Sequence, residues 1–270
     1  MCLHHVSQEN RNFASKITSK NSNMSFAGIL AGNNIGEVWA DDLSNPAFCL
    51  VWSEYVEGFH FMGSRYAHTN ELELWAFIED TIIPFLKSKK MEYMEFSCDS
   101  PEWIPFICKV FSTREINKWK QFTYTLVQHS NLNISLTLSA GYEAIKIDAD
   151  FISNKLADME NPEIIRTEIE KAWGSVAKFF ECGKGFAAVH GTQICSFATT
   201  ESVYGDTYGI SIKTVGEWQT SVPKSGKNHW KTHEKAPEWR FRFFLGTRLA
   251  TPKRLTLIGK KVYPVSCQWP

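Results

Sequence analysis

The chain has 270 residues, of which 43% are hydrophobic and 14% aromatic, and its formal net charge is zero. This composition excludes a largely disordered chain, and the length allows one large domain or two ordinary ones, of which we favour two. No apolar run approaches the roughly 18 to 20 residues of a membrane span, and the first residues lack a secretory signal pattern, so we expect a cytoplasmic protein without a membrane segment.

The cysteines and histidines indicate neither a disulfide framework nor a metal site. Seven cysteines are scattered along the chain and never form a CxxC pair, which is typical of reduced, mostly structural thiols. The eight histidines include no HExxH motif. We therefore expect no metal ion.

Short strands and helices alternate in the first half of the chain, and we predict an N-terminal α/β domain over residues 1–130. The predicted strands are residues 35–42, 47–54, 58–64 and 91–98, followed by the alternating apolar and polar residues of 121–128. The predicted helices are residues 69–90 and 101–112. Asn70 is the expected N-cap of the longer helix, and Pro84 is expected to kink it or loosen its last turn.

After a polar stretch over residues 129–141, which we interpret as a linker, a second domain is predicted over residues 138–270. It begins with a strand over 142–148 and one helix over 161–180, with Asn161 as cap and Pro162 at the first helical position. Three strands follow over residues 185–191, 192–202 and 207–214. Their short connections predict an antiparallel meander.

The charge is divided unevenly along the chain. Residues 220–270 hold 11 Lys and Arg against 2 Asp and Glu, a net charge of +9, which leaves 18 against 27, or −9, for residues 1–219. Helical periodicity is also poor beyond residue 220, where only residues 240–246 and 259–267 resemble strands.

The segment "FFECGKGFAAVHGTQICSFATTESVYGDTYGISIKTVGEWQ" resembles the two-domain bacterial N-acetyltransferases of the GNAT superfamily. The matching positions are Phe179, Gly185, Phe186, Ile194, Ser196, Thr200, Glu201, Ile212, Thr214, Glu217, Trp218 and Gln219. The resemblance extends, more weakly, back to about residue 30. It implies an α/β (α+β) fold with a mixed, largely antiparallel sheet flanked by helices, and direct transfer of an acetyl group from acetyl-CoA to a small amine.

The resemblance also assigns roles to particular residues. Ile212, Lys213 and Thr214 are expected to form an open strand edge that binds the pantetheine arm of acetyl-CoA. Glu201 is the expected general base, and a solvated strand-end carboxylate is the alternative. Tyr204 and Tyr208 are candidate general acids or substrate-lining groups, and Tyr263 is a further candidate for the proton donor to the thiolate.

The family binds the coenzyme pyrophosphate with a glycine-rich loop, and this chain departs from that pattern. The loop would begin at Gln219, but Val222 and Lys224 stand at its next key positions. A displaced loop around Lys224 and Gly226 is one interpretation, and an ordinary basic surface loop is the other. Because the resemblance and the charge balance both change here, we hypothesise that residues 220 onward derive from a shifted reading frame.

Two other classes of function stay open at the level of sequence. One is a catalytically degenerate GNAT fold that binds acyl-CoA, or only a protein partner, without turnover. The basic tail with its aromatic residues would also suit a single-stranded nucleic acid, but no recognised nucleic-acid motif accompanies it, so we do not favour this partner.

Overall fold

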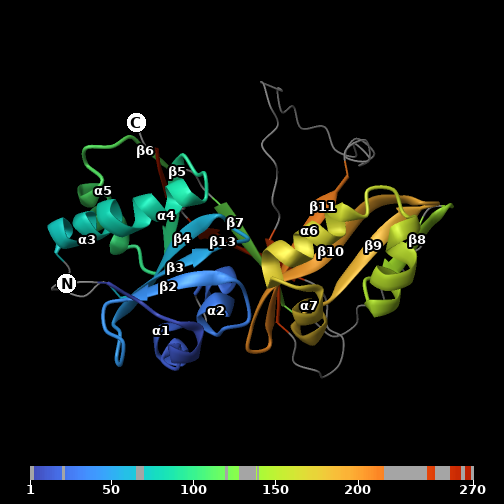
Figure 1. Cartoon of the computed structure of the whole chain (residues 1–270), viewed down its shortest axis with the longest axis horizontal. Helices are drawn as coiled ribbons and strands as arrows, with labels where there is room; N and C mark the ends of the chain where they lie inside the picture. Colours follow the sequence, from blue (N-terminus) through green and yellow to red (C-terminus); the bar gives the residue numbers. More distant parts are fainter. Residues whose placement is uncertain are drawn as a thin grey trace.

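The computed structural model describes residues 3–19, 22–64, 70–118, 121–127, 138, 140–215, 242–246, 256–262 and 265–268. Over these ranges the strands form two seven-stranded sheets. Figure 1 shows them as two lobes that lie side by side. The predicted linker lies mostly outside the described residues.

The first sheet has the strand order β1-β2-β3-β4-β5-β14-β6. Its strands are β1 (His4–His5), β2 (Gly36–Ala40), β3 (Phe48–Ser53), β4 (Gly58–Gly63), β5 (Tyr93–Cys98), β6 (Ile116–Lys118) and β14 (Val265–Gln268). The helices α1 (Ala14–Ile17) and α2 (Met24–Leu30) cover one face, and α3 (Glu71–Phe77), α4 (Ile83–Ser88) and α5 (Trp103–Val110) cover the other. Every residue of β3 is buried, as its continuous apolar sequence requires of a strand covered on both faces.

The second sheet has the order β13-β7-β12-β11-β10-β9-β8. Its strands are β7 (Gln121–Val127), β8 (Tyr142–Lys146), β9 (Gly185–His190), β10 (Gln193–Tyr204), β11 (Thr207–Thr214), β12 (Arg242–Gly246) and β13 (Thr256–Val262). The helices α6 (Glu163–Trp173) and α7 (Val176–Cys182) pack beside it, and four short helical segments complete the described elements: η1 (Gln8–Asn10), η2 (Ile78–Ile82), η3 (Phe151–Lys155) and η4 (Leu156–Asp158). The predicted meander of β9, β10 and β11 is confirmed, because both pairings are antiparallel.

Each sheet includes a strand from the other part of the chain. β7 comes directly after β6 in sequence, but it pairs with β12 and β13 of the second sheet. β14 comes after β13 in sequence, but it pairs with β5 and β6 of the first sheet. The two halves are therefore joined by exchanged strands as well as by side chains. The domain boundaries stay a prediction.

The longer helix of the first half forms with a local change of geometry. The Asn70 side chain accepts a hydrogen bond from the Leu72 backbone at 2.9 Å, as predicted for an N-cap. Ahead of Pro84 the chain forms the π-helical turn η2. Proline lacks the N–H that an α-helix would use at this position, so the disturbance expected from Pro84 takes the form of a widened turn.

The prediction of one helix over residues 161–180 was wrong. α6 begins at Glu163 and ends at Trp173, and the next residue, Gly174, adopts a left-handed conformation with φ of 78°. Ser175 then caps α7 by accepting a hydrogen bond from the Lys178 backbone at 3.1 Å. The glycine ends one helix and the serine starts the next, because these are the preferred residues of a C-cap and an N-cap.

Candidate active site

The site is built around the end of β11. The ladder between β10 and β11 continues to the pair Ser196↔Thr214, whereas the described part of the ladder between β11 and β12 reaches Ser211↔Arg242, and Arg242 is the first described residue of β12. Within the described residues, Ile212, Lys213 and Thr214 therefore pair with β10 alone, and the residues before them pair with both β10 and β12.

The direction of the backbone groups follows from the register. Val215 donates its backbone N–H to the Cys195 carbonyl at 2.9 Å, so the backbone groups of Val215 and of Lys213, two residues earlier, point toward β10. Since successive residues of an antiparallel strand alternate in direction, the N–H and C=O of Ile212 point to the opposite side. The Ile212 side chain is 42% exposed. Ile212 thus directs its peptide groups away from β10, toward the side where no described residue pairs with Ile212.

Glu201 occupies a β-bulge in β10. Thr200 pairs with Ile210 and Ser202 pairs with Gly209, so Glu201 is the extra residue. Its side chain is 3% exposed and accepts a hydrogen bond from the Ser25 hydroxyl of α2 at 3.1 Å. A Cβ atom built on Gly209 would lie 3.5 Å from Glu201 Oε1, which places the carboxylate over this glycine. Glu201 is therefore not a solvated strand-end carboxylate.

Ser202, the residue beside it, is also buried. Its hydroxyl has no hydrogen-bond partner among the described residues. A buried hydroxyl without a partner is uncommon and is a feature of sites that receive a polar ligand.

Two asparagines of the first half complete the edge of β10 around the bulge. The ladder to β9 covers only the part of β10 that precedes Glu201. Beyond it, Asn34 Nδ2 donates to the Glu201 carbonyl at 2.9 Å, Asn34 Oδ1 accepts from the Val203 N–H at 3.3 Å, and Asn33 Nδ2 donates to the Val203 carbonyl at 2.9 Å. These side-chain amides replace a neighbouring strand and satisfy the buried backbone groups of the bulge.

A second buried carboxylate, which sequence reasoning missed, lies next to β11. Glu168 of α6 is 3% exposed and accepts hydrogen bonds from the hydroxyls of Tyr55 and Ser211 and from the Lys213 ammonium group. Burial raises the pKa of Tyr55 well above its usual range, and the charges of Glu201 and Glu168 raise it further. The Tyr55 hydroxyl therefore stays protonated and available as a donor. The only feature of the sequence that could have indicated this carboxylate is the position of Glu168 on the inner face of a helix.

The structure does not bring all the predicted residues together. The Lys184 ammonium group lies over the Tyr208 ring, 5.6 Å from its centroid, and the Tyr204 hydroxyl contacts Thr18 Oγ1. Tyr208 and Gly209 are neighbours in a strand and face opposite sides, so Tyr208 points away from the carboxylate of Glu201. Gln219, Lys224, Gly226 and Tyr263 lie outside the described residues.

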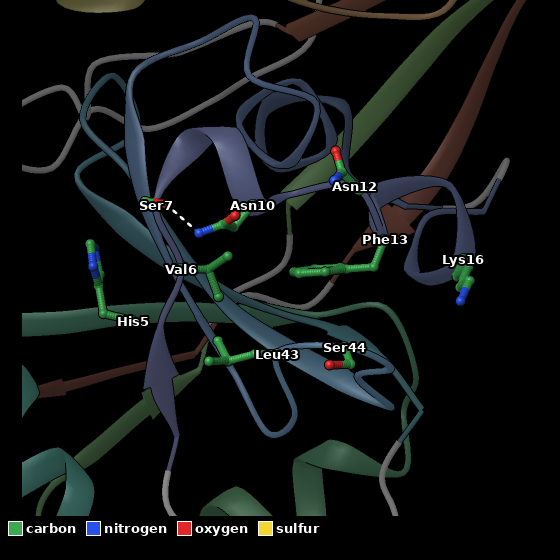
Figure 2. Close-up of a pocket in the computed structure, with 9 residues that line it drawn as sticks. All are labelled: His5, Val6, Ser7, Asn10, Asn12, Phe13, Lys16, Leu43 and Ser44. Atoms are coloured by element: carbon green, nitrogen blue, oxygen red, sulfur yellow. Dashed lines mark hydrogen bonds between the residues drawn. The ribbon is translucent and has the colours of Figure 1, made fainter.

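The described cavities lie apart from the end of β11. A cavity of about 570 Å³ opens between the N-terminal segment and the loop after β2, and its lining includes Phe13, Leu43, Asn10 and Lys16 (Figure 2). A second cavity of about 470 Å³ lies nearer the junction of the halves and is lined in part by Arg11, Asn34 and Trp173. Neither contains a residue predicted for the site.

A family model described as GNAT acetyltransferase matches residues 15–221. The chain belongs to the GNAT acetyltransferase family. The matched range includes Glu201 and the whole of β11, and it ends two residues after Gln219. No curated protein matches the sequence.

A solved structure supports the GNAT fold. The chain is similar to a GCN5-related N-acetyltransferase-like protein from Streptococcus suis, with a TM-score of 0.55, 11% identity, and coverage of 96% of this chain and 99% of that one. A GCN5-related N-acetyltransferase from Kribbella flavida gives a TM-score of 0.48 and 9% identity, with 96% and 95% covered. A tandem GNAT protein from the clavulanic acid biosynthesis pathway gives 0.41 and 10%, with 99% of each chain covered.

No helix within the described ranges is long and apolar enough to cross a membrane. In the same ranges, no group of three or more His, Cys, Asp or Glu side chains is arranged to hold a metal ion.

Proposed function

We propose that this GNAT protein transfers an acetyl group from acetyl-CoA directly to a small amine. The observation that carries the proposal is the direction of the Ile212 peptide groups, which point away from β10 to a side where no described residue pairs with Ile212. The pantetheine arm contains amides that can hydrogen-bond to such an edge as an added strand would. In this proposal Ile212, Lys213 and Thr214 hold the arm, and Gln219, Lys224 and Gly226 hold the pyrophosphate.

The chemistry requires a base, a polarised carbonyl and an acid. Glu201 is the proposed base that takes a proton from the acceptor amine, whose nitrogen then attacks the thioester carbonyl. Backbone N–H groups near Ile212 polarise that carbonyl, and the carbon–sulfur bond breaks to release the thiolate of coenzyme A. Tyr208 and Tyr263 are the proposed sources of the thiolate's proton.

The acceptor is proposed to bind at the junction of the two predicted domains. Glu201 lies there against Ser25 of α2, and the unpartnered hydroxyl of Ser202 lies beside it. Ligand sites often occur at such junctions. Cys49, Cys98, Cys108 and Cys182 are free thiols, and we propose that the protein works in the reducing cytoplasm.

Calorimetric titration with acetyl-CoA, combined with a turnover assay on a panel of small amines, tests this function. Saturable binding with acetylation of at least one amine supports the proposal. Saturable binding without turnover on any amine contradicts the enzymatic part and favours a degenerate acyl-CoA-binding protein. Absence of binding contradicts both and favours an interaction protein.

A further inference from the structure

We infer that Glu168 is a positioning residue that holds β11 in place for coenzyme binding. The inference rests on the proposed function, because it concerns the same strand edge. It assigns a role to a residue on α6, a helix that contributes none of the residues in the proposed acetyl-CoA site.

Both carboxylate oxygens of Glu168 are occupied. Oε1 accepts hydrogen bonds from the Tyr55 hydroxyl and, at 3.0 Å, from the Ser211 hydroxyl, and Oε2 accepts from the Lys213 ammonium group. A buried carboxylate is tolerated only when it is paired and hydrogen-bonded, so these donors are held in one arrangement. With its acceptor positions filled in this way, Glu168 is suited to fixing its neighbours and poorly suited to taking a substrate proton.

Two of the donors flank the edge that the proposal uses. Ser211 and Lys213 lie on either side of Ile212, and their side chains share the face of β11 that looks toward α6. Ser211 is also the last residue that pairs with β12 among the described residues. On both sides of Ile212, the Glu168 carboxylate therefore holds β11 through the side chains of that strand.

The third donor connects the other half of the molecule. Tyr55 lies in the turn between β3 and β4 of the first sheet, and its hydroxyl also lies 2.7 Å from Ser211 Oγ. The position of the β11 edge consequently depends on the packing of the first half against α6. Loss of Glu168 is expected to loosen the strand and weaken coenzyme binding, and to affect the chemical step less.

Glu168→Leu and Glu168→Gln test the role by removing the contacts of Glu168 to different extents. Leucine removes every acceptor, whereas glutamine keeps an oxygen for Tyr55 and Ser211 and replaces the charged oxygen that accepts from Lys213 with an NH2 donor. Lys171→Met is the matched control, because Lys171 lies on the same helix and pairs with Glu57 of the same turn at 2.5 Å, without contacting β11.

The first measurement is amide hydrogen exchange at Lys213 and Val215, whose N–H groups point toward β10. We expect exchange about tenfold faster in Glu168→Leu, less so in Glu168→Gln, and unchanged in Lys171→Met. The second is acetyl-CoA affinity, which should weaken about tenfold in Glu168→Leu while kcat at saturating acetyl-CoA changes by less than about threefold.

Exchange in Glu168→Leu that equals the Lys171→Met control would overturn the inference, and so would unchanged acetyl-CoA affinity. If Glu168→Leu does not fold, Tyr55→Phe removes one donor and keeps the aromatic ring. Faster amide exchange and weaker acetyl-CoA binding are then expected, with smaller changes than in Glu168→Leu. The two proposals fail separately: an unmodified protein that does not bind acetyl-CoA contradicts the function, while the exchange measurement still decides whether Glu168 holds the strand.

Discussion

Glu201 combines burial with an unusual backbone position. A bulge re-aims the side chain of its extra residue, and here it directs the carboxylate over Gly209 and against Ser25 of α2. Gly209 leaves the space for both bulge side chains, because a Cβ atom there would lie 2.3 Å from Ser202 Oγ and 3.3 Å from Glu201 Cγ. This placement gives the proposed base a fixed position between the two halves of the molecule.

Glu201→Gln should lower kcat by about 10²- to 10⁴-fold, because the amide keeps the shape of the side chain and cannot accept a proton from the amine. Acetyl-CoA affinity should stay within about twofold, since Glu201 lies away from Ile212 along the strand pair. Steady-state kinetics and calorimetry check both expectations. The exposed Glu170 of α6 provides the control Glu170→Gln, and an unaltered rate in Glu201→Gln would remove Glu201 from its proposed role.

Asp99 gives the first half a pH-dependent element of stability. Burial alone would raise the pKa of Asp99, but the hydrogen bond and charge of His60 at 2.9 Å and the Ser22 hydroxyl at 2.8 Å hold that pKa below its usual range. Asp99 therefore binds a proton more readily in the unfolded chain than in the folded protein. The stabilisation is present above the unfolded pKa and is lost as the pH falls through the folded one.

Thermal unfolding of the unmodified protein and of Asp99→Asn should therefore differ most near neutral pH. The difference in Tm is expected to shrink below about pH 4, where the unfolded carboxyl becomes protonated. Scans at several pH values measure it. A difference that stays constant between neutral pH and pH 3 would contradict this assignment to Asp99.

At the scale of elements, α2 packs directly against β10. Gly28 allows this approach, because a Cβ atom there would lie 2.4 Å from Asn34 Oδ1 and 3.0 Å from the Val203 carbonyl. Both atoms belong to the hydrogen bonds that complete the β10 edge, so neither can move freely. The contact between the halves therefore depends on a residue without a side chain.

Gly28→Ala should destabilise the protein by about 1 to 3 kcal/mol through overpacking. In an exposed helix the same change would stabilise by about 0.5 to 1 kcal/mol, so the sign of the effect identifies the tight contact. Denaturant unfolding measures it. Gly205 provides a comparison, because a Cβ atom added there would meet no atom within 4 Å. Its φ of 60° adds backbone strain of its own in the Gly205→Ala variant.

Local sequence patterns predicted most of these elements. The short connections of β9, β10 and β11 identified the meander, and Asn70 identified the start of α3, because turns and caps depend on a few adjacent residues. The helical pattern of residues 161–180 does not reveal the break at Gly174, and the single helix predicted there was wrong. Glu168 and Asn34 could not be found in the same way, since their partners lie more than 40 residues away in sequence.

At the scale of the whole molecule, the exchange of β7 and β14 between the sheets was also beyond local reasoning. Alternation in residues 121–128 predicts a strand but cannot choose the sheet it joins. The family resemblance in the second half was more informative about the site, because it carried Glu201 and the β11 edge together. It became uninformative near Gln219, where the family match also ends.

The shifted-frame hypothesis for residues 220 onward makes a prediction about the gene. The charge changes from −9 to +9 near the residue where the family match ends, as a change of frame would produce. We expect another frame across codons 219 to 262 to encode the glycine-rich pyrophosphate motif that the family carries. Translation of the two other frames checks this, and the hypothesis fails if neither contains acetyltransferase-like sequence.

The central claim concerns the peptide groups at the end of β11, and a proline tests them most directly. Ile212→Pro removes the Ile212 N–H, which points away from β10, and spares the β10–β11 ladder; a strand tolerates proline where its N–H lies outside a ladder. Ile212→Ala removes the side chain and keeps the N–H. In calorimetric titration with acetyl-CoA, we predict affinity about tenfold weaker for Ile212→Pro and nearly unchanged for Ile212→Ala. Equal affinities of the folded proline and alanine variants would contradict the account.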